Sequence, residues 1–399
     1  MTDILELFTG IGIVIDDALE RQEQRDDPIW KITENIESKN IPLLFYYDLP
    51  EENICKQFKN INFVLLDWEL FEKPEPGLRI DTAPFITANI AFIKRIAEVT
   101  FVPIFIFSNE QPDAIINHLV VAGIYIEGKK NNIFVKQKSD LIAEDNNNLL
   151  FEEIEKWVKE TPSIYVLKEW EVSLNSAKRN LFHDFYILHH EWPLALAKAF
   201  NIDGADMDYE LGGFIYKNLS ARAIPVHFDD AIIKKEDFQV EKNDLIKVLE
   251  GERFVKSDLP DLPFPGDIFK EEYEEGGVAK ERYYINIRAA CDIARHPNPE
   301  LYFLKGRIVD ENRINSNEED SIIFKCGSFI ERVDLTYVPF INGKLFEFLF
   351  KELKIKKWNS FKQYRIGRLL PPYITKIQQK YSFYIQRQGL PGIPHEAVE

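Results

Sequence analysis

The stretch Ile61-Asn-Phe-Val-Leu-Leu-Asp-Trp68 decides the fold of the N-terminal part of the chain. Its apolar residues form a nearly continuous run, which is typical of a strand buried on both faces of a parallel sheet. That run closes on Asp67, and an earlier one, Ile11-Gly-Ile-Val-Ile-Asp-Asp17, closes on an acidic pair. Because the carboxyl ends of the strands in an open parallel sheet meet at one crevice, we expect three carboxylates to lie close together.

Clustered carboxylates imply a divalent metal ion. Their mutual repulsion raises carboxylate pKa values and costs free energy unless a hard cation lies among the oxygens. Two further buried runs, residues 101–107 and 132–135, are followed by Ser108 and Lys136. A metal ion, a nucleophilic carboxylate, a hydroxyl and an ammonium at one edge of a sheet form the set that phosphoryl transfer uses.

Over residues 8–145 this pattern resembles the receiver domain of two-component response regulators. The match comprises Asp16-Asp17 after the first strand, Asp67 followed by Trp68 after the third, Ser108 after the fourth and Lys136 after the fifth. The resemblance implies a flavodoxin-like, doubly wound parallel sheet. It also implies that Asp67 is the phosphoacceptor, which takes phosphate from a histidine kinase.

The same resemblance implies a role for each of the other positions. Mg²⁺ would be bound by Asp17, Asp67 and the backbone carbonyl of Glu69, with Asp16 assisting, while Ser108 would be the switch hydroxyl and Lys136 the partner of the phosphate.

Three departures from the receiver pattern stand out. The interval from Asp67 to Ser108 is long and contains a polar, Pro-rich segment at residues 71–81. Gln137 stands where the family usually has Pro, and the position of the aromatic switch residue falls on Ile133 or Phe134. A simpler interpretation of one aspartate is also open, since Asp16 or Asp17 could cap a helix that begins near Ala18.

Composition excludes several classes of protein. Hydrophobic residues make up 45% of the 399 residues and aromatic residues 13%, which excludes general disorder. A net charge of −17 argues against broad contact with nucleic acid or an anionic membrane. The three cysteines, Cys55, Cys291 and Cys326, suit a reducing compartment. With no signal-peptide pattern and no apolar run of membrane-spanning length, a soluble, cytoplasmic protein is expected.

The pattern of elements predicts three domains: a receiver at 1–150, a helical connector at 151–235 and a β-rich domain of unknown function at 236–399. Helices are expected over residues 83–99, 149–159 and through most of 163–223. Strand-like runs follow at 283–288, 301–308, 321–325 and 332–338, with a helix near 371–388. They indicate a small barrel or curved sheet with a covering helix.

The layout of the whole chain resembles that of receiver-bearing regulatory proteins of Detocs-type anti-phage defence systems. Besides the layout, this resemblance rests on residues 287–293 and 389–391. It implies a phosphate buffer that competes for the phosphate of a histidine kinase and so restrains an effector.

Three functions remain open. The chain could be a phosphate sink or regulator that has no enzymatic output of its own and acts through an effector protein or a self-dimer. It could be a phosphorylation-gated effector with an unrecognised C-terminal activity, for which Asp292 and His296 are the first candidates. It could also be a scaffold on a degenerate receiver, in which Asp67 is only structural.

Overall fold

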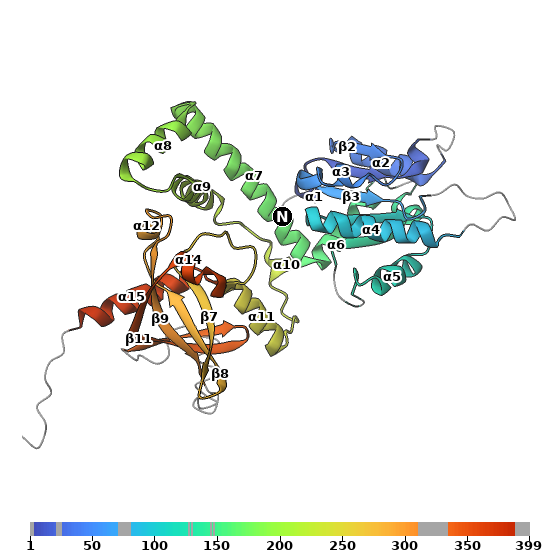
Figure 1. The fold of residues 1–399 in the computed structure, drawn as a ribbon. Helices are drawn as coiled ribbons and strands as arrows, with labels where there is room; N and C mark the ends of the chain where they lie inside the picture. Colours follow the sequence, from blue (N-terminus) through green and yellow to red (C-terminus); the bar gives the residue numbers. More distant parts are fainter. Residues whose placement is uncertain are drawn as a thin grey trace, which may run out of the picture. The chain divides into compact units, whose positions relative to one another are not determined.

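The computed structural model describes residues 4–20, 26–70, 81–126, 128, 131–143, 146, 148–309 and 334–387. The chain divides into two compact units, which are coloured along the sequence in Figure 1. The first comprises Met1–Asp184 with Asn218–Glu236, and the second Phe185–Lys217 with Asp237–Glu399. The predicted domain limits at 150 and 235 stay a prediction.

The first unit contains a five-stranded parallel sheet in the order β2-β1-β3-β4-β5. This is the strand order of the flavodoxin-like doubly wound fold, so the predicted fold class of the N-terminal part is confirmed. The strands are β1 (Gly12–Ile15), β2 (Leu43–Tyr46), β3 (Phe63–Leu66), β4 (Ile104–Ser108) and β5 (Ile133–Gln137).

Helices cover both faces of this sheet, which explains why the inner strands are apolar throughout. Helices α2 (Pro28–Ser38) and α6 (Leu149–Glu160) pack on one face, and α4 (Ala83–Val99) and α5 (Pro112–Val121) on the other. The predicted helix over residues 83–99 is α4, and the one over 149–159 is α6. Alternate strand residues supply the two cores: Val14, Phe63, Leu65, Phe105, Phe107 and Phe134 on the first face, and Ile13, Ile15, Val64, Leu66, Ile104, Ile106 and Ile133 on the second.

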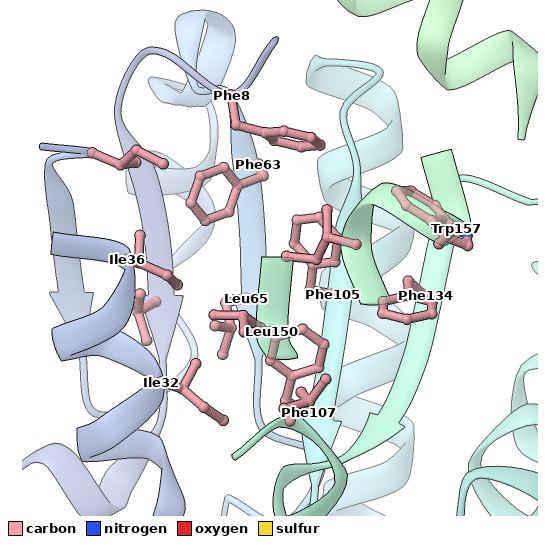
Figure 2. Close-up of a cluster of buried hydrophobic side chains, with 14 of the residues drawn as sticks. Phe8, Ile32, Ile36, Phe63, Leu65, Phe105, Phe107, Phe134, Leu150 and Trp157 are labelled. Carbon is pink, nitrogen blue, oxygen red and sulfur yellow. The ribbon is translucent and has the colours of Figure 1, made fainter. Parts of the chain in front are cut away.

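Aromatic rings fill the centre of the first face, as Figure 2 shows. The ring of Phe105 on β4 lies 5.7 Å from that of Phe63 on β3, 5.9 Å from Phe8 and 5.6 Å from Trp157 on α6. Tilted and edge-to-face pairs at such distances are favourable beyond the area that they bury. These contacts fix the strands relative to one another, and with them the carboxyl edge of the sheet.

Shorter elements complete the first unit. They are α1 (Ile4–Leu7), η1 (Asp17–Leu19), α3 (Glu52–Cys55), η3 (Phe58–Asn60), η4 (Lys138–Leu141) and α10 (Asp230–Ile233).

The chain from residue 162 to 223 is helical, as expected, and forms α7 (Pro162–Leu188), α8 (Trp192–Asp203) and α9 (Met207–Ala223). Helix α7 belongs to the first unit as far as Asp184, and Lys168 is completely buried there. Its Nζ donates to the backbone oxygen of Asn62 at 2.8 Å and to Oδ1 of the same residue at 2.7 Å. Among the described residues, no helix has the length and apolar composition to cross a bilayer.

The second unit carries a seven-stranded antiparallel sheet in the order β10-β11-β9-β8-β7-β12-β6. Figure 1 shows it strongly curled, with α15 (Tyr373–Gln386) packed against it. The predictions of a mainly β C-terminal part with a covering helix are therefore confirmed. The strands are β6 (Phe254–Val255), β7 (Asp267–Glu275), β8 (Val278–Asn286), β9 (Glu300–Ile308), β10 (Leu335–Ile341), β11 (Lys344–Lys357) and β12 (Arg365–Leu369).

Individual strands of this sheet were harder to predict. The runs at 283–288 and 301–308 fall on β8 and β9, and the run at 332–338 overlaps β10, whereas 321–325 lies outside the described residues. Strands β6, β7, β11 and β12 correspond to no predicted run. The remaining helices of this unit are α11 (Lys242–Arg253), α12 (Ala290–Ile293), α14 (Trp358–Phe361) and η6 (Lys362–Tyr364).

Candidate functional site

Three carboxylates meet at the carboxyl edge of the parallel sheet. Asp16 and Asp17 follow β1, Asp67 follows the neighbouring strand β3, and one oxygen of each lies within 4.8 Å of the others. Asp16 is fully buried and Asp67 nearly so, while Asp17 is half-buried. The structure therefore brings together the three aspartates that the sequence placed at strand ends.

The capping interpretation of Asp16 is correct as well. Its Oδ1 accepts a hydrogen bond of 3.0 Å from the backbone N–H of Ala18 and thereby caps η1. Its Oδ2 lies 2.7 Å from Nζ of Lys138, an ion pair without good hydrogen-bond geometry. One oxygen is thus used for the backbone turn, and the other remains directed at the site.

Lys138 supplies the ammonium of the site. Its side chain is completely buried, and Nζ lies 2.7 Å from Oδ2 of Asp67 and 3.3 Å from Oδ1 of Asp27. Lys138 is the first residue of η4, directly beyond the end of β5. Together with Asp16, three carboxylates share this one ammonium.

The prediction that Lys136 is the lysine beside Asp67 is wrong. Strand β5 extends to Gln137, two residues beyond the predicted end, so position 136 lies inside the strand and pairs with Phe107. Its Nζ points toward α6, where it forms an ion pair of 2.7 Å with Glu153. Within β5 a side chain points to one face of the sheet, and here the lysine that reaches the carboxyl edge is Lys138, the first residue past the strand.

The peptide that follows Asp67 is held in place by the protein. The backbone N–H of Glu69 donates to Oδ1 of Asp67 at 3.1 Å, and the buried Asn89 on α4 donates from Nδ2 to the carbonyl of Trp68 at 2.8 Å. Ser108, the last residue of β4, is buried, and its Oγ lies 3.5 Å from Oε2 of Glu69. Ser108 thus reaches the site through the side chain of Glu69.

Besides Lys138, two further residues of the site, Asp27 and Asn89, were missed at the level of sequence. Asp27 caps α2 by accepting from the N–H of Ile29 at 2.9 Å, and the sequence Asp-Pro at the start of a helix is a recognisable signal for such a cap. Nothing in the sequence places that cap beside Lys138. Asn89 lies on the buried face of a helix, and no motif marks it.

The charges of this site affect one another strongly. Burial, followed by the neighbouring charge of Asp67, raises the pKa of Asp16 to about 7. Burial acts to lower the pKa of Lys138, but the carboxylates of Asp67 and Asp16 outweigh it and the pKa is raised. One ammonium does not offset the surrounding carboxylates. A hard divalent cation bound to Asp16, Asp17 and Asp67 fits both the oxygen donors and the surplus of negative charge.

Comparisons with known proteins add little. No family model and no curated protein matches the chain. A response regulator from Burkholderia pseudomallei, solved with a phosphorylated aspartic acid, calcium ion and citrate, is 12% identical over 37% of this chain and 72% of its own, with a TM-score of 0.21. A fusion of the yeast Spc42 trimeric coiled coil is 11% identical over 39% and 80%, with a TM-score of 0.25. These TM-scores are too low to support a structural relationship. The receiver-like fold is therefore inferred from the strand order alone.

The C-terminal candidates lie in the second unit. Cys291 and Asp292 lie in α12, and the thiol of Cys291 is exposed. His296 lines a pocket of about 210 Å³ together with Tyr209 and Arg295. Asp292 is not among the lining residues of that pocket, and its side chain lies 3.9 Å from the thiol of Cys291.

Trp68 offers a direct test of metal binding. Its indole is buried next to Asp67 and stacks on His118 with ring centroids 6.4 Å apart, so a change at the carboxylates should alter its fluorescence. We expect a saturable change on titration with Mg²⁺ in the millimolar range. Replacing the half-buried Asp17 by Asn should weaken the apparent affinity about tenfold, because affinity follows the number of charged ligands.

The control for this titration is Trp68→Phe, which should remove the signal while leaving the other tryptophans in place. A fluorescence change that persists unaltered in Asp17→Asn would place the Mg²⁺ elsewhere.

Proposed function

We propose that this chain accepts a phosphoryl group on Asp67, in a Mg²⁺-dependent transfer from a phosphohistidine of a histidine kinase. The observation that carries the proposal is the 2.7 Å contact between the buried ammonium of Lys138 and Oδ2 of Asp67, within a cluster of carboxylates at strand ends. A carboxylate that served structure alone would not need two further aspartates within 4.8 Å. Their repulsion favours a site that takes up positive charge and then phosphate.

The residues present suit each part of the reaction. An oxygen of Asp67 forms the bond to phosphorus as the bond from phosphorus to the donor nitrogen breaks, and the leaving imidazole retains the electron pair. Lys138 neutralises charge on the phosphoryl oxygens, and Ser108 offers a hydroxyl beside Glu69. Mg²⁺, held by the three aspartates and the main-chain carbonyl of Glu69, would supply further charge neutralisation when bound.

The resemblance to defence proteins extends the proposal to a pathway. The chain would act as a regulator or phosphate buffer in anti-phage defence, drawing phosphate from a kinase that also serves another receiver. The alternative of a phosphorylation-gated effector has one supporting observation, the pocket that His296 lines in the second unit.

Labelling of the full chain tests the proposal. Incubation with Mg²⁺ and acetyl phosphate, or with a labelled histidine kinase, should add one phosphoryl group that is labile to hydroxylamine, as an acyl phosphate is. Removal of Mg²⁺ with a chelator should reduce labelling to background. If neither donor labels the chain, the scaffold interpretation replaces this one.

The same experiment addresses the pathway. A phosphate buffer should lower the labelling of a second receiver when both compete for one kinase. Undiminished labelling of the competitor would remove the buffer role, whereas a phosphorylation-dependent change in a nucleotide or metabolite pool would favour the gated effector.

A further inference from the structure

Asp27 lies outside the cluster at the strand ends but reaches the same lysine. It precedes α2 and caps that helix, since its Oδ1 accepts from the N–H of Ile29 at 2.9 Å. The same Oδ1 lies 3.3 Å from Nζ of Lys138. Only 20% of its side chain is exposed. The start of α2 and the ammonium of the site are therefore joined through one oxygen atom.

The helical cap keeps this carboxylate where it is. Helix α2 is held on the sheet by Ile29, Ile32 and Ile36, all of which are buried in the core of the first face. Because the cap ties Asp27 to the first turn of an anchored helix, its carboxylate cannot follow Lys138 if the ammonium moves. The distance from Asp27 to Lys138 is then set by the position of the lysine alone.

Phosphorylation of Asp67 would change the charges around Lys138. A phosphoryl group adds a charge of about −1.5 to −2 and oxygen atoms that attract an ammonium strongly. Lys138 would then be drawn toward the phosphoryl oxygens, away from the fixed carboxylate of Asp27. That carboxylate would also repel the phosphoryl group, because two like charges in a buried setting are weakly screened.

We propose that Asp27 is a positioning residue, which holds Lys138 in the resting site and competes with the phosphoryl group on Asp67 for its ammonium. This inference rests on the proposed function of Asp67. It assigns to the N-cap residue of α2 the regulation of how long the phosphorylated form persists. Asp27 would therefore act through Lys138 and not by touching the reacting atoms.

The structure provides variants that separate the charge of Asp27 from its cap. Asn caps a helix about as well as Asp, so Asp27→Asn removes the charge and keeps the cap, whereas Asp27→Ala removes both. The matched control is Asp229→Asn: Asp229 caps α10 in the same way, accepting from the N–H of Ala231 at 2.8 Å, and belongs to the same unit.

The full chain should be phosphorylated with acetyl phosphate and Mg²⁺, and the decay of the phosphorylated form followed after the donor is removed. We expect Asp27→Asn to lengthen its half-life about fivefold, because one nearby negative charge has been removed. Asp27→Ala should lengthen it similarly and, in addition, lower the urea midpoint of unfolding. Asp229→Asn should change neither the half-life nor the site.

A half-life of Asp27→Asn equal to that of wild type, or shorter, overturns the inference. So does a lengthening in Asp27→Ala alone, since the loss of the cap would then be the cause.

A second measurement distinguishes this failure from a failure of the proposed function. If the wild-type chain takes up no phosphoryl group at all, the proposed role of Asp67 as phosphoacceptor is wrong. Asp27 then has no phosphoryl group with which to compete for Lys138. A double-mutant cycle of Asp27→Asn and Lys138→Gln, measured by urea unfolding, then decides whether Asp27 holds Lys138. Losses of stability that do not add support the link, and additive losses overturn it.

Discussion

Asp67→Asn is expected to abolish phosphoryl transfer to this chain while leaving the fold intact. The amide oxygen and nitrogen of Asn lack the negative charge of the attacking carboxylate, so labelling should fall to background with either donor. Asn keeps one side-chain oxygen, which can accept from the N–H of Glu69 as Oδ1 of Asp67 does, and Lys138 keeps its ion pairs with Asp16 and Asp27. Relief of its repulsion with Asp16 should keep the melting temperature at or above that of wild type.

The measurement is intact-mass spectrometry of the chain after incubation with acetyl phosphate and Mg²⁺. Asp140→Asn is the matched control, because Asp140 lies in the same turn as Lys138 but is exposed, and it should be labelled like wild type. Full labelling of Asp67→Asn would assign the phosphoryl group to another side chain and leave Asp67 a structural role.

Much of the first unit could be predicted because its signals are local. Helix α4 has the predicted bounds, and β3 and β4 are apolar runs whose burial follows from a parallel sheet covered on both faces. Edge strand β2 is partly exposed, which makes its signal weaker. In the second unit the pairing of β7 with β12 joins residues about a hundred positions apart, and no local sequence pattern predicts which strands will pair over that separation.

The site was predictable to the extent that strand ends were. Asp16 and Asp67 come directly after short apolar runs. Even if the predicted end of either strand were wrong by one residue, these aspartates would still lie at the carboxyl edge of the sheet. The end of β5 is ambiguous, because Val135-Lys-Gln-Lys138 offers a lysine inside the strand and another just past it. Strand boundaries are the least certain part of any prediction from sequence, and here two residues decided which lysine enters the site.

Replacing Lys138 should therefore have a much larger effect than replacing Lys136. Lys138→Ala leaves Asp16 and Asp67 buried without their counter-charge, and breaking a buried ion pair in this way typically costs about 3–5 kcal/mol. The lower end of that range is expected, because burial already raises the pKa of Asp16 to about 7 and protonation can relieve part of the repulsion. Lys136→Ala breaks only a partly exposed pair with Glu153, worth about 1 kcal/mol or less.

Urea unfolding at neutral pH, with and without Mg²⁺, measures both effects. Mg²⁺ should restore part of the stability of Lys138→Ala, because a cation bound to the carboxylates replaces the missing charge. Mg²⁺ should increase the stability of Lys136→Ala by no more than it increases that of the wild type. In the labelling experiment Lys136→Ala should accept phosphate normally, whereas Lys138→Ala should be labelled weakly or lose its label quickly.

Lys138→Arg separates charge from shape. The guanidinium keeps the positive charge, but its planar fork is larger than an ammonium that lies 2.7 Å from two carboxylates at once. We expect it to recover most of the stability that Lys138→Ala loses and only part of the labelling. If Lys136→Ala instead shows the greater loss of both stability and label, the ammonium that serves Asp67 in solution is Lys136, and the last strand of the sheet ends two residues earlier than in this structure.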